Sequence, residues 1–370
     1  MKNGLKRRRS GFRLPAPDSR SRVNRLFAPF VSALSFVAVF GWALLSGKYL
    51  VGGDVFFYTY PLRSVAWDAI RAGRLPLWTP HVLSGYPLLS MSQLALGYPV
   101  TWGHLVLPHH LAEQLYIYAP FLLTPAFTYF FAREAGRSRL ASALAGLTFA
   151  YGGLMTNGFG MNGLTTNAVA WLPLLLAAAE RALRRKTTAA PLLLGACAYA
   201  LSVLNGYGLG FLYVALVALA YALFLSLFVR PPAADGAEAA VSEADDSKAG
   251  DSEHGARRGS PSWRARWDRF RPFAVAAASV ALGAGVAAFQ ILETMRAARR
   301  SIRSKLTYDF FIEGSFTPAA AVRSFLAPPY HFIEVTANVS ALAFLLALCA
   351  VVAWLAGRAA ETARPRDGQP

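Results

Sequence analysis

The sequence is poor in charged residues and almost free of cysteine. Only 15% of its 370 residues are Asp, Glu, Lys or Arg, whereas a soluble domain usually carries about 25%. The two cysteines, Cys197 and Cys349, both lie inside apolar runs. Two such residues can build neither a disulfide framework nor a thiol metal site. The chain is therefore neither a disulfide-stabilised domain nor a domain built around a cysteine-bound metal.

Acidic residues are scarcer than basic ones. The chain has 20 Asp and Glu against 37 Lys and Arg, which gives a formal net charge of +17. In a soluble protein this excess would suggest a nucleic-acid partner. Here the basic residues lie between apolar runs rather than in one patch. Membrane topology explains them better, and no nucleic-acid partner is predicted.

Long apolar runs are what the chain has in place of charge. Hydrophobic residues make up 55% of the sequence, and several runs approach the ~20 residues that a helix needs to cross a hydrocarbon core. The pattern predicts an all-α polytopic membrane protein with about eight transmembrane helices. The expected helices are 27–45, 111–132, 140–155, 168–183, two within 189–229, 273–292 and 339–356.

The segments between these runs differ in composition and divide the chain. One of them, rich in Ala, Ser, Asp and Glu, lacks the large apolar side chains that would order it, so it is predicted to be a flexible linker. The expected divisions are a basic cytoplasmic tail at 1–26, a membrane domain at 27–230 with an outer loop at 46–110 that carries short helices, a flexible and then basic cytoplasmic linker at 231–272, two further membrane helices within 273–356 with an outer loop at 293–338, and a cytoplasmic tail at 357–370.

The distribution of Lys and Arg predicts the orientation. With the N-terminus inside, the cytoplasmic segments hold 27 basic residues and the outer loops hold 10. Basic residues near helix ends are retained on the cytoplasmic side, so both termini are predicted to be inside. Six of the outer basic residues lie in 293–338. Long loops escape the rule, yet this group needs a separate reason.

Asp54 is the main candidate for chemistry in the first outer loop. It lies a few residues beyond the first predicted helix, among aromatic residues. A carboxylate that is partly desolvated at the membrane face could act as a general base. A helix cap or loop anchor is the alternative. The other acid of this loop, Asp68, lies beside Arg71 in an amphipathic stretch and is predicted to be a solvated surface residue.

Three further features of this region could take part in binding. His110 and Glu113 share one face of the second helix, but two ligands at this spacing are weak support for a metal site, and none is predicted. His81 lies in a Pro-rich string and could reach a phosphate or a sugar hydroxyl. Trp78 could stack on a sugar ring or a prenyl chain, although aromatic anchoring at the membrane interface is the usual role of such residues.

Several different short motifs follow one another along the chain. They are Asp54, Pro61, Gly73, Pro76-Leu77-Trp78, Pro80, Gly85, Pro87, Gln93 and Pro99 in the first outer loop, then Arg133-x-x-Gly136-x-Ser138-Arg139, then Asn167 with Trp171-Leu172-Pro173, then Gln290 and Ser301-x-Arg303. This order resembles that of the YfhO-type family of bacterial membrane proteins. Two positions depart from the family pattern, with Thr79 in place of an Asn and Glu293-Thr294 where a Pro is usual.

The resemblance implies a GT-C-like membrane glycosyltransferase. Such an enzyme moves a sugar from a polyprenyl-phosphate carrier to a polymer or lipid acceptor of the cell envelope, on the outer face of the bacterial inner (cytoplasmic) membrane. It implies that Asp54 deprotonates the acceptor hydroxyl in a single inverting displacement, which needs no second carboxylate, unlike the paired acids of glycosidases. Whether a divalent cation assists stays open.

The resemblance also gives the basic second loop a use. Arg300, Arg303 and Lys305 are expected to hold the donor phosphate, because Arg offers a planar fork to phosphate oxygens. Binding of lipid headgroups by an interfacial basic helix is the alternative. The residues expected to bind sugar or acceptor are Arg63, Trp78, His81 and Gln93.

Two other classes of function stay open. One is a transporter or flippase for a lipid-linked substrate, and the other is a non-catalytic protein that binds prenyl lipids. Transporters tend to carry ionisable residues within their helices and to show internal repeats. The predicted helices are almost free of charge and show no convincing repeat, which favours the enzyme over the transporter.

Overall fold

A computed structural model describes residues 22–50, 54–82, 84–156, 162–185, 187–229 and 263–301, together with 305, 307–308, 319, 348–349 and 352. Within these residues the chain is α-helical. The only β feature among them is an isolated antiparallel bridge between Thr79 and Tyr86. The predicted all-α class is therefore confirmed for the part of the chain that the structure describes.

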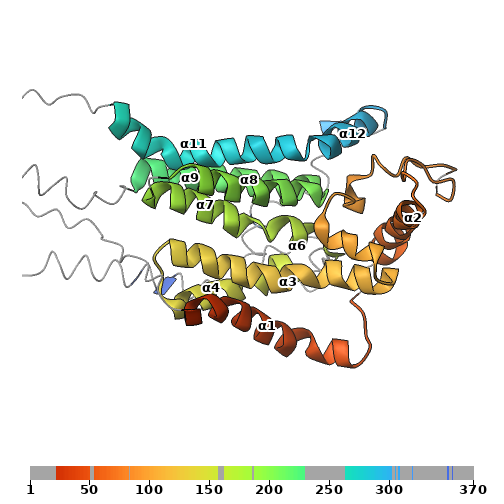
Figure 1. The fold of residues 1–370 in the computed structure, drawn as a ribbon, viewed down its shortest axis with the longest axis horizontal. Helices are drawn as coiled ribbons and strands as arrows, with labels where there is room; N and C mark the ends of the chain where they lie inside the picture. Colours follow the sequence, from red (N-terminus) through yellow and green to blue (C-terminus); the bar gives the residue numbers. More distant parts are fainter. Residues whose placement is uncertain are drawn as a thin grey trace, which may run out of the picture.

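A bundle of helices forms the body of the protein. Figure 1 shows its members side by side along the long axis of the molecule. They are α1 (Arg22–Leu45), α3 (His109–Glu134), α4 (Arg139–Ala150), α7 (Leu172–Arg184), α8 (Ala189–Leu204), α9 (Gly208–Phe228) and α11 (Trp263–Val286). The short helices α5 (Gly153–Thr156) and α6 (Leu164–Val169) fill the gap between α4 and α7 in the sequence.

Three helices of this bundle are long and apolar enough to cross a membrane. They are Leu26–Leu45, His109–Glu134 and Gly208–Phe228. A fourth candidate is the pair Trp267–Val286 and Ala288–Arg299, whose axes meet at 70°. Several long apolar helices of this kind are typical of a multi-pass membrane protein.

The described residues do not reach the eight full-length spans that the sequence predicts. The run 140–155 yields α4, which has only 12 residues, and the run 168–183 yields α7 with 13 residues after a break that follows α6. At 1.5 Å per residue such helices are shorter than a hydrocarbon core. The last predicted helix, 339–356, lies outside the described residues apart from single positions.

Small residues let the bundle helices approach one another closely. A Cβ atom added at Gly195 would lie 2.5 Å from the Ser279 hydroxyl, and one at Gly283 would lie 2.7 Å from the Ala196 carbonyl oxygen, so α8 and α11 touch almost backbone to backbone. The outer face of α9 instead exposes large apolar side chains such as Leu212 and Leu216. Tight inner contacts and an apolar exterior are what a helix bundle in lipid requires.

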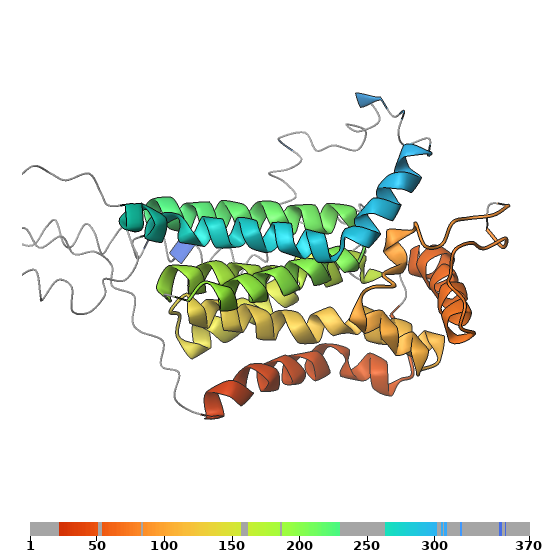
Figure 2. The ribbon, with the colours of Figure 1, turned by 45° about the horizontal axis from the view of Figure 1, so that its top comes forward.

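One end of the bundle carries most of the first predicted outer loop. We name residues 54–108 the outer segment. It contains the π-helix η1 (Val55–Thr59), α2 (Tyr60–Arg71) and the 3-10 helices η2 (Ser92–Leu94) and η3 (Pro99–Leu105). Figures 1 and 2 show this segment beyond the ends of the long helices, with α12 (Ala288–Arg299) at the same end. The short helices expected in this loop are therefore present.

Candidate functional site

Asp54 stands at the entrance of the outer segment. It precedes the π-helix η1 and makes no side-chain capping bond to it, and its side chain is exposed. Single turns of π-helix are rare and often occur at functional sites. Phe56 and Phe57 follow with 60% and 81% of their surface exposed. Exposed aromatic side chains thus follow Asp54 directly, while its own side chain is exposed rather than desolvated within the protein.

Asp54 differs from the other acids at this end of the bundle. Among the described residues there, Asp68 contacts His109 at 2.8 Å, Glu113 pairs with Arg63, and Glu293 pairs with an arginine one turn along α12. No hydrogen bond or ion pair joins the Asp54 carboxylate to any described residue. Its carboxylate is thus the one at this end that is open to an incoming group within the described chain.

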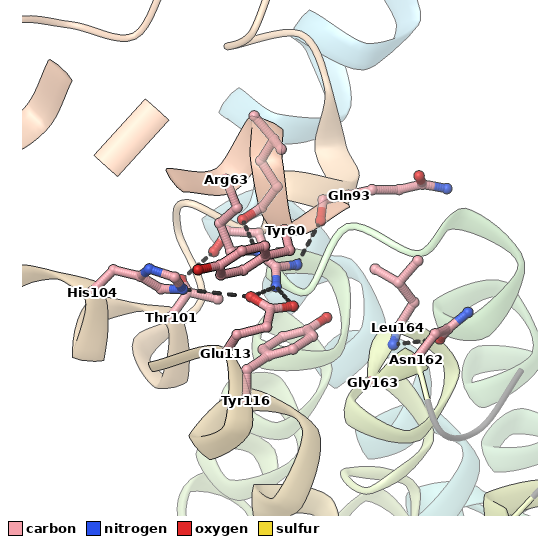
Figure 3. Close-up of polar contacts among 12 residues, drawn as sticks. Tyr60, Arg63, Gln93, Thr101, His104, Glu113, Tyr116, Asn162, Gly163 and Leu164 are labelled. Carbon is pink, nitrogen blue, oxygen red and sulfur yellow. Dashed lines mark hydrogen bonds and ion pairs between the residues drawn. The ribbon is translucent and has the colours of Figure 1, made fainter. Parts of the chain in front are cut away.

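Arg63 lies at the centre of the outer segment and is completely buried. Its Nη1 donates to both carboxylate oxygens of Glu113 at 2.6 Å. Its Nη2 donates to the Gln93 carbonyl at 3.0 Å and its Nε to the Leu94 carbonyl at 3.2 Å. The guanidinium also lies over the Tyr116 ring, 4.2 Å from its centre. Figure 3 shows Arg63 pointing from α2 toward Glu113 and Tyr116 of α3.

This arrangement corrects the role expected for Arg63. A sugar or acceptor would need a free donor, and all three nitrogens of Arg63 are already engaged inside the protein. Burial by itself lowers the pKa of Arg63, but Glu113 and Tyr116 together outweigh it and the pKa lies above its ordinary value. The side chain therefore stays charged and fastens the loop around Gln93 to α2 and α3.

Glu113 makes this anchor possible from a position near the start of α3, one turn after its first residue. It is 2% exposed and holds a charge-assisted, two-oxygen contact to a single Arg nitrogen. A charge can be buried in this way only when it is paired and hydrogen-bonded. The sequence suggested Glu113 only as a weak metal ligand with His110. Its partner is instead 50 positions earlier in the chain.

Two histidines extend the polar contacts from Glu113 to the surface. His104 Nε2 lies 3.5 Å from Glu113 Oε2, within ion-pair distance but too long for a good hydrogen bond. His104 Nδ1 lies 2.9 Å from His109 Nδ1, and His109 Nε2 lies 2.8 Å from Asp68 Oδ1. The side chain of Asp68 is 63% exposed. A continuous row of titratable groups thus runs from a buried carboxylate to a solvent-exposed one.

His104 is the most buried member of this row. The Trp67 ring stacks on it with an interplanar angle of 6°. Burial lowers the pKa of His104, and the nearby Arg63 charge lowers it further, against the opposing effect of Glu113. The imidazole is therefore neutral at neutral pH. Neither His104 nor its contact with His109 was anticipated from the sequence, because no local pattern joins them to Glu113.

A second polar cluster fastens the outer segment to the bundle. Tyr98 donates to Asn167 Oδ1 at 3.0 Å and accepts from Trp171 Nε1 at 3.2 Å. Tyr116 donates to Asn205 Oδ1 at 2.6 Å. Asn167 and Trp171 belong to the motifs that carry the family resemblance. In this structure both hold the junction between the outer segment and the bundle, and neither is exposed to a substrate.

The turn at Asn205-Gly206 completes this junction. Gly206 has a φ of +81°, and a Cβ atom added to it would lie 1.8 Å from the Ser92 carbonyl oxygen. Only glycine fits such a position, because other residues rarely adopt this backbone conformation and would clash here. The tight turn predicted between the two helices of 189–229 is confirmed, and it also explains how η2 approaches the bundle.

The remaining residues expected to bind sugar or acceptor lie apart from the buried anchor. Trp78 is 60% exposed, and its ring covers Gly85, where a Cβ atom would lie 2.2 Å away. His81 is exposed. Gln93 contributes its carbonyl group to Arg63, while Figure 3 shows its side chain pointing away from that contact. The structure therefore leaves Trp78 and His81 accessible and gives Gln93 a backbone role.

The basic second loop is only partly described. Arg300 follows α12 and is exposed, as is Lys305, whereas Arg303 lies outside the described residues. α12 leans on the outer segment, since Thr294 lies 3.5 Å from the Ser90 carbonyl and Phe289 lies against Gly97. α12 and the outer segment, which begins at Asp54, thus belong to the same end of the bundle (Figure 2).

Comparisons with known proteins give no relative. No family model, curated protein or solved structure matches this chain.

Within the described residues no three His, Cys, Asp or Glu side chains are grouped so that they could hold a metal ion.

Proposed function

We propose that the protein is a GT-C-like membrane glycosyltransferase that takes a sugar from a polyprenyl-phosphate carrier. The observation that carries this proposal is the unpaired, exposed carboxylate of Asp54 at an end of the bundle where Asp68, Glu113 and Glu293 are all partnered. A general base has to be free to accept a proton from its substrate. The resemblance to the YfhO-type family, untested by any match, points to the same residue.

The proposed reaction is a single displacement at the anomeric carbon. Asp54 takes the proton of the acceptor hydroxyl, the acceptor oxygen bonds to the sugar carbon, and the bond from that carbon to the carrier phosphate breaks. The electron pair leaves with the phosphate, and the anomeric configuration inverts. Arg300, Arg303 and Lys305 are the proposed holders of that phosphate, because fixed positive charge stabilises an anion as it develops. Trp78 and His81 are the proposed contacts for sugar or acceptor.

The proposed location is the bacterial inner membrane, with the N-terminus inside and this site on the outer face. The end of the bundle opposite the outer segment supports that orientation. Arg133 and Arg185 lie at the ends of α3 and α7 there, and Arg269 and Arg271 lie near the start of α11. Basic residues concentrate on the cytoplasmic side of membrane proteins. Membrane lipids and a polymer or lipid acceptor of the envelope are the proposed partners, and a divalent cation stays open.

The test replaces the proposed base. The purified full-length chain is assayed in liposomes with a polyprenyl-phosphate hexose, and envelope glycans are analysed by mass in a strain that lacks the native gene. We expect Asp54→Asn to lower kcat by roughly 10²–10⁴, the usual contribution of a general base, and Asp54→Glu to restore part of it.

Asp268→Asn is the matched control, because Asp268 is an exposed acid on α11 at the opposite end of the bundle. This variant should keep full activity. If Asp54→Asn transfers sugar as fast as the unmodified chain, Asp54 is not the base and the proposed mechanism fails. Arg300→Gln should raise KM for the donor and also lower kcat, since this residue is proposed both to bind the carrier phosphate and to stabilise its developing charge.

A transporter or flippase for a lipid-linked substrate is the second candidate. The buried ionisable groups Arg63, Glu113 and His104 favour it, since such groups near the ends of membrane helices often mark a substrate or proton path. Movement of a fluorescent polyprenyl phosphate between the leaflets of liposomes, with no sugar transferred, would support this function. A chain that binds the same lipid and performs neither step would be a non-catalytic binder.

A further inference from the structure

The row of groups from Asp68 to Glu113 contains one contact more than its protons can supply. The three contacts are Asp68 to His109 at 2.8 Å, His109 to His104 at 2.9 Å, and His104 to Glu113 at 3.5 Å. Each hydrogen bond needs a proton on one of the ring nitrogens, because both carboxylates act only as acceptors when ionised. When both imidazoles are neutral, they bring only two protons.

The two short contacts fix where those protons lie. His109 must donate from Nε2 to Asp68, so its Nδ1 is an acceptor. His104 must then donate from Nδ1, which leaves its Nε2 without a proton. That nitrogen is buried and has no hydrogen-bond partner among the described residues. The 3.5 Å distance between His104 Nε2 and Glu113 Oε2 agrees with this placement of the protons. Neither atom then carries a proton, so both are acceptors and no hydrogen bond can join them.

We propose that the facing rings of His104 and His109 form a proton-binding site that takes up one additional proton from the outer side of the membrane. The third proton would complete the contact between His104 Nε2 and Glu113. It would leave one positive charge shared by two rings between two carboxylates. The exposed Asp68 side chain gives this site its access to water.

The charges around the pair set its affinity for the proton. Asp68 of α2 and Glu113 of α3 favour the charged pair. Two arginines of α2, Arg63 and Arg71, oppose the charged pair, and Arg71 Nη1 lies 3.9 Å from Asp68. The burial of His104 against Trp67 also opposes it. Tyr116 of α3 faces Arg63 rather than the imidazoles. Uptake is therefore expected on the acidic side of neutrality.

The proton would act on the anchor of the outer segment. Glu113 Oε2 already accepts from Arg63 Nη1 at 2.6 Å, and the protonated His104 would give it a second charged donor. A positive charge on His104 also faces the Arg63 guanidinium, which it repels. Proton uptake would thus weaken the contact between Arg63 and Glu113, which holds the loop around Gln93. The pH outside the membrane would in this way affect how firmly the outer segment is held on the bundle.

The experiment follows the ring nitrogens directly. The full-length chain, with ¹⁵N-labelled histidine, is placed in lipid nanodiscs and titrated by NMR. Above neutral pH we expect His104 to carry its proton on Nδ1 and His109 on Nε2. On acidification the pair should gain one proton in a single step, and Asp68→Asn should move the midpoint of that step to lower pH. His109→Gln should move the step of His104 to lower pH, because the positive charge can then no longer be shared by two rings.

His110→Gln is the matched control. His110 is the next residue of α3, but its ring lies against Tyr49 and forms no ion pair with a described carboxylate, so the step should be unchanged. The proposal is overturned if His104 carries its proton on Nε2 at neutral pH. It is equally overturned if the two rings each gain a proton in separate steps, or if Asp68→Asn leaves the midpoint where it was.

Discussion

Replacing Glu113 by glutamine gives the sharpest test of the anchor that holds the outer segment. The variant keeps the shape of the side chain and removes its charge, so Arg63 stays buried without a counter-ion. The two side chains are 0% and 3% exposed and 2.6 Å apart. For charge centres about 4 Å apart at an effective dielectric of about 20, the attraction amounts to ~4 kcal/mol. Removing one partner of a buried pair costs ~3–5 kcal/mol in measured cases.

We therefore expect Glu113→Gln to lower the free energy of unfolding by ~3 kcal/mol or more. The assay is reversible unfolding of the purified chain in mixed micelles, followed by circular dichroism. Glu293→Gln is the matched control, because the Glu293–Arg296 pair on α12 is far more exposed. Exposed pairs contribute ~0–1 kcal/mol.

A double replacement separates the ion pair from the rest of the anchor. Arg63→Met should cost more than Glu113→Gln, since it also leaves the carbonyl groups of Gln93 and Leu94 without a donor. The two changes together should cost less than the sum of the single changes, because the second removes a partner that the first had already left unpaired. If Glu113→Gln is no more harmful than Glu293→Gln, the anchor does not hold the outer segment and the reasoning fails.

Two further predictions test the junction and the histidines. Gly206→Ala should destabilise the chain by more than ~1 kcal/mol, because its Cβ atom would meet Ser92 at a φ of +81°; Gly208→Ala, which has open space, should be close to neutral in the same unfolding assay. Since burial holds the pKa of His104 below its ordinary value, the unfolded chain binds more protons just below pH ~6.5. Unfolding measured against pH should therefore show stability that is complete above that value and falls as the pH drops, and His104→Gln should flatten this fall.

The bundle could be predicted from the sequence wherever one run of apolar residues makes one helix. α1, α3 and α9 match the predicted helices closely, and so does α8. The runs at 140–155 and 168–183 were predicted less well. Composition along the chain cannot show that α4 ends at Ala150, or that a break separates α6 from α7. Such breaks depend on packing against neighbouring helices, which a window of sequence does not contain.

The candidate site was predictable only in part, for a similar physical reason. Asp54 could be singled out because its signal is local, a carboxylate just beyond an apolar run. The burial of Arg63 could not, since it depends on Glu113 50 positions away and on carbonyl groups about 30 positions away. An arginine in a polar loop resembles a binding residue in the sequence. In the structure the same chemistry is directed inward and serves stability.

The motifs that carry the family resemblance divide along the same line. Asn167 and Trp171 bind Tyr98, Gln93 accepts from Arg63 through its backbone, and Gly85 lies under the Trp78 ring. These residues shape the outer segment and hold it on the bundle, so their contacts determine architecture rather than chemistry. Asp54 is different, because its carboxylate is not needed for any contact among the described residues. We therefore expect Asp54→Asn to fold as stably as the unmodified chain, and, if the proposed function is right, to lose most of its sugar transfer.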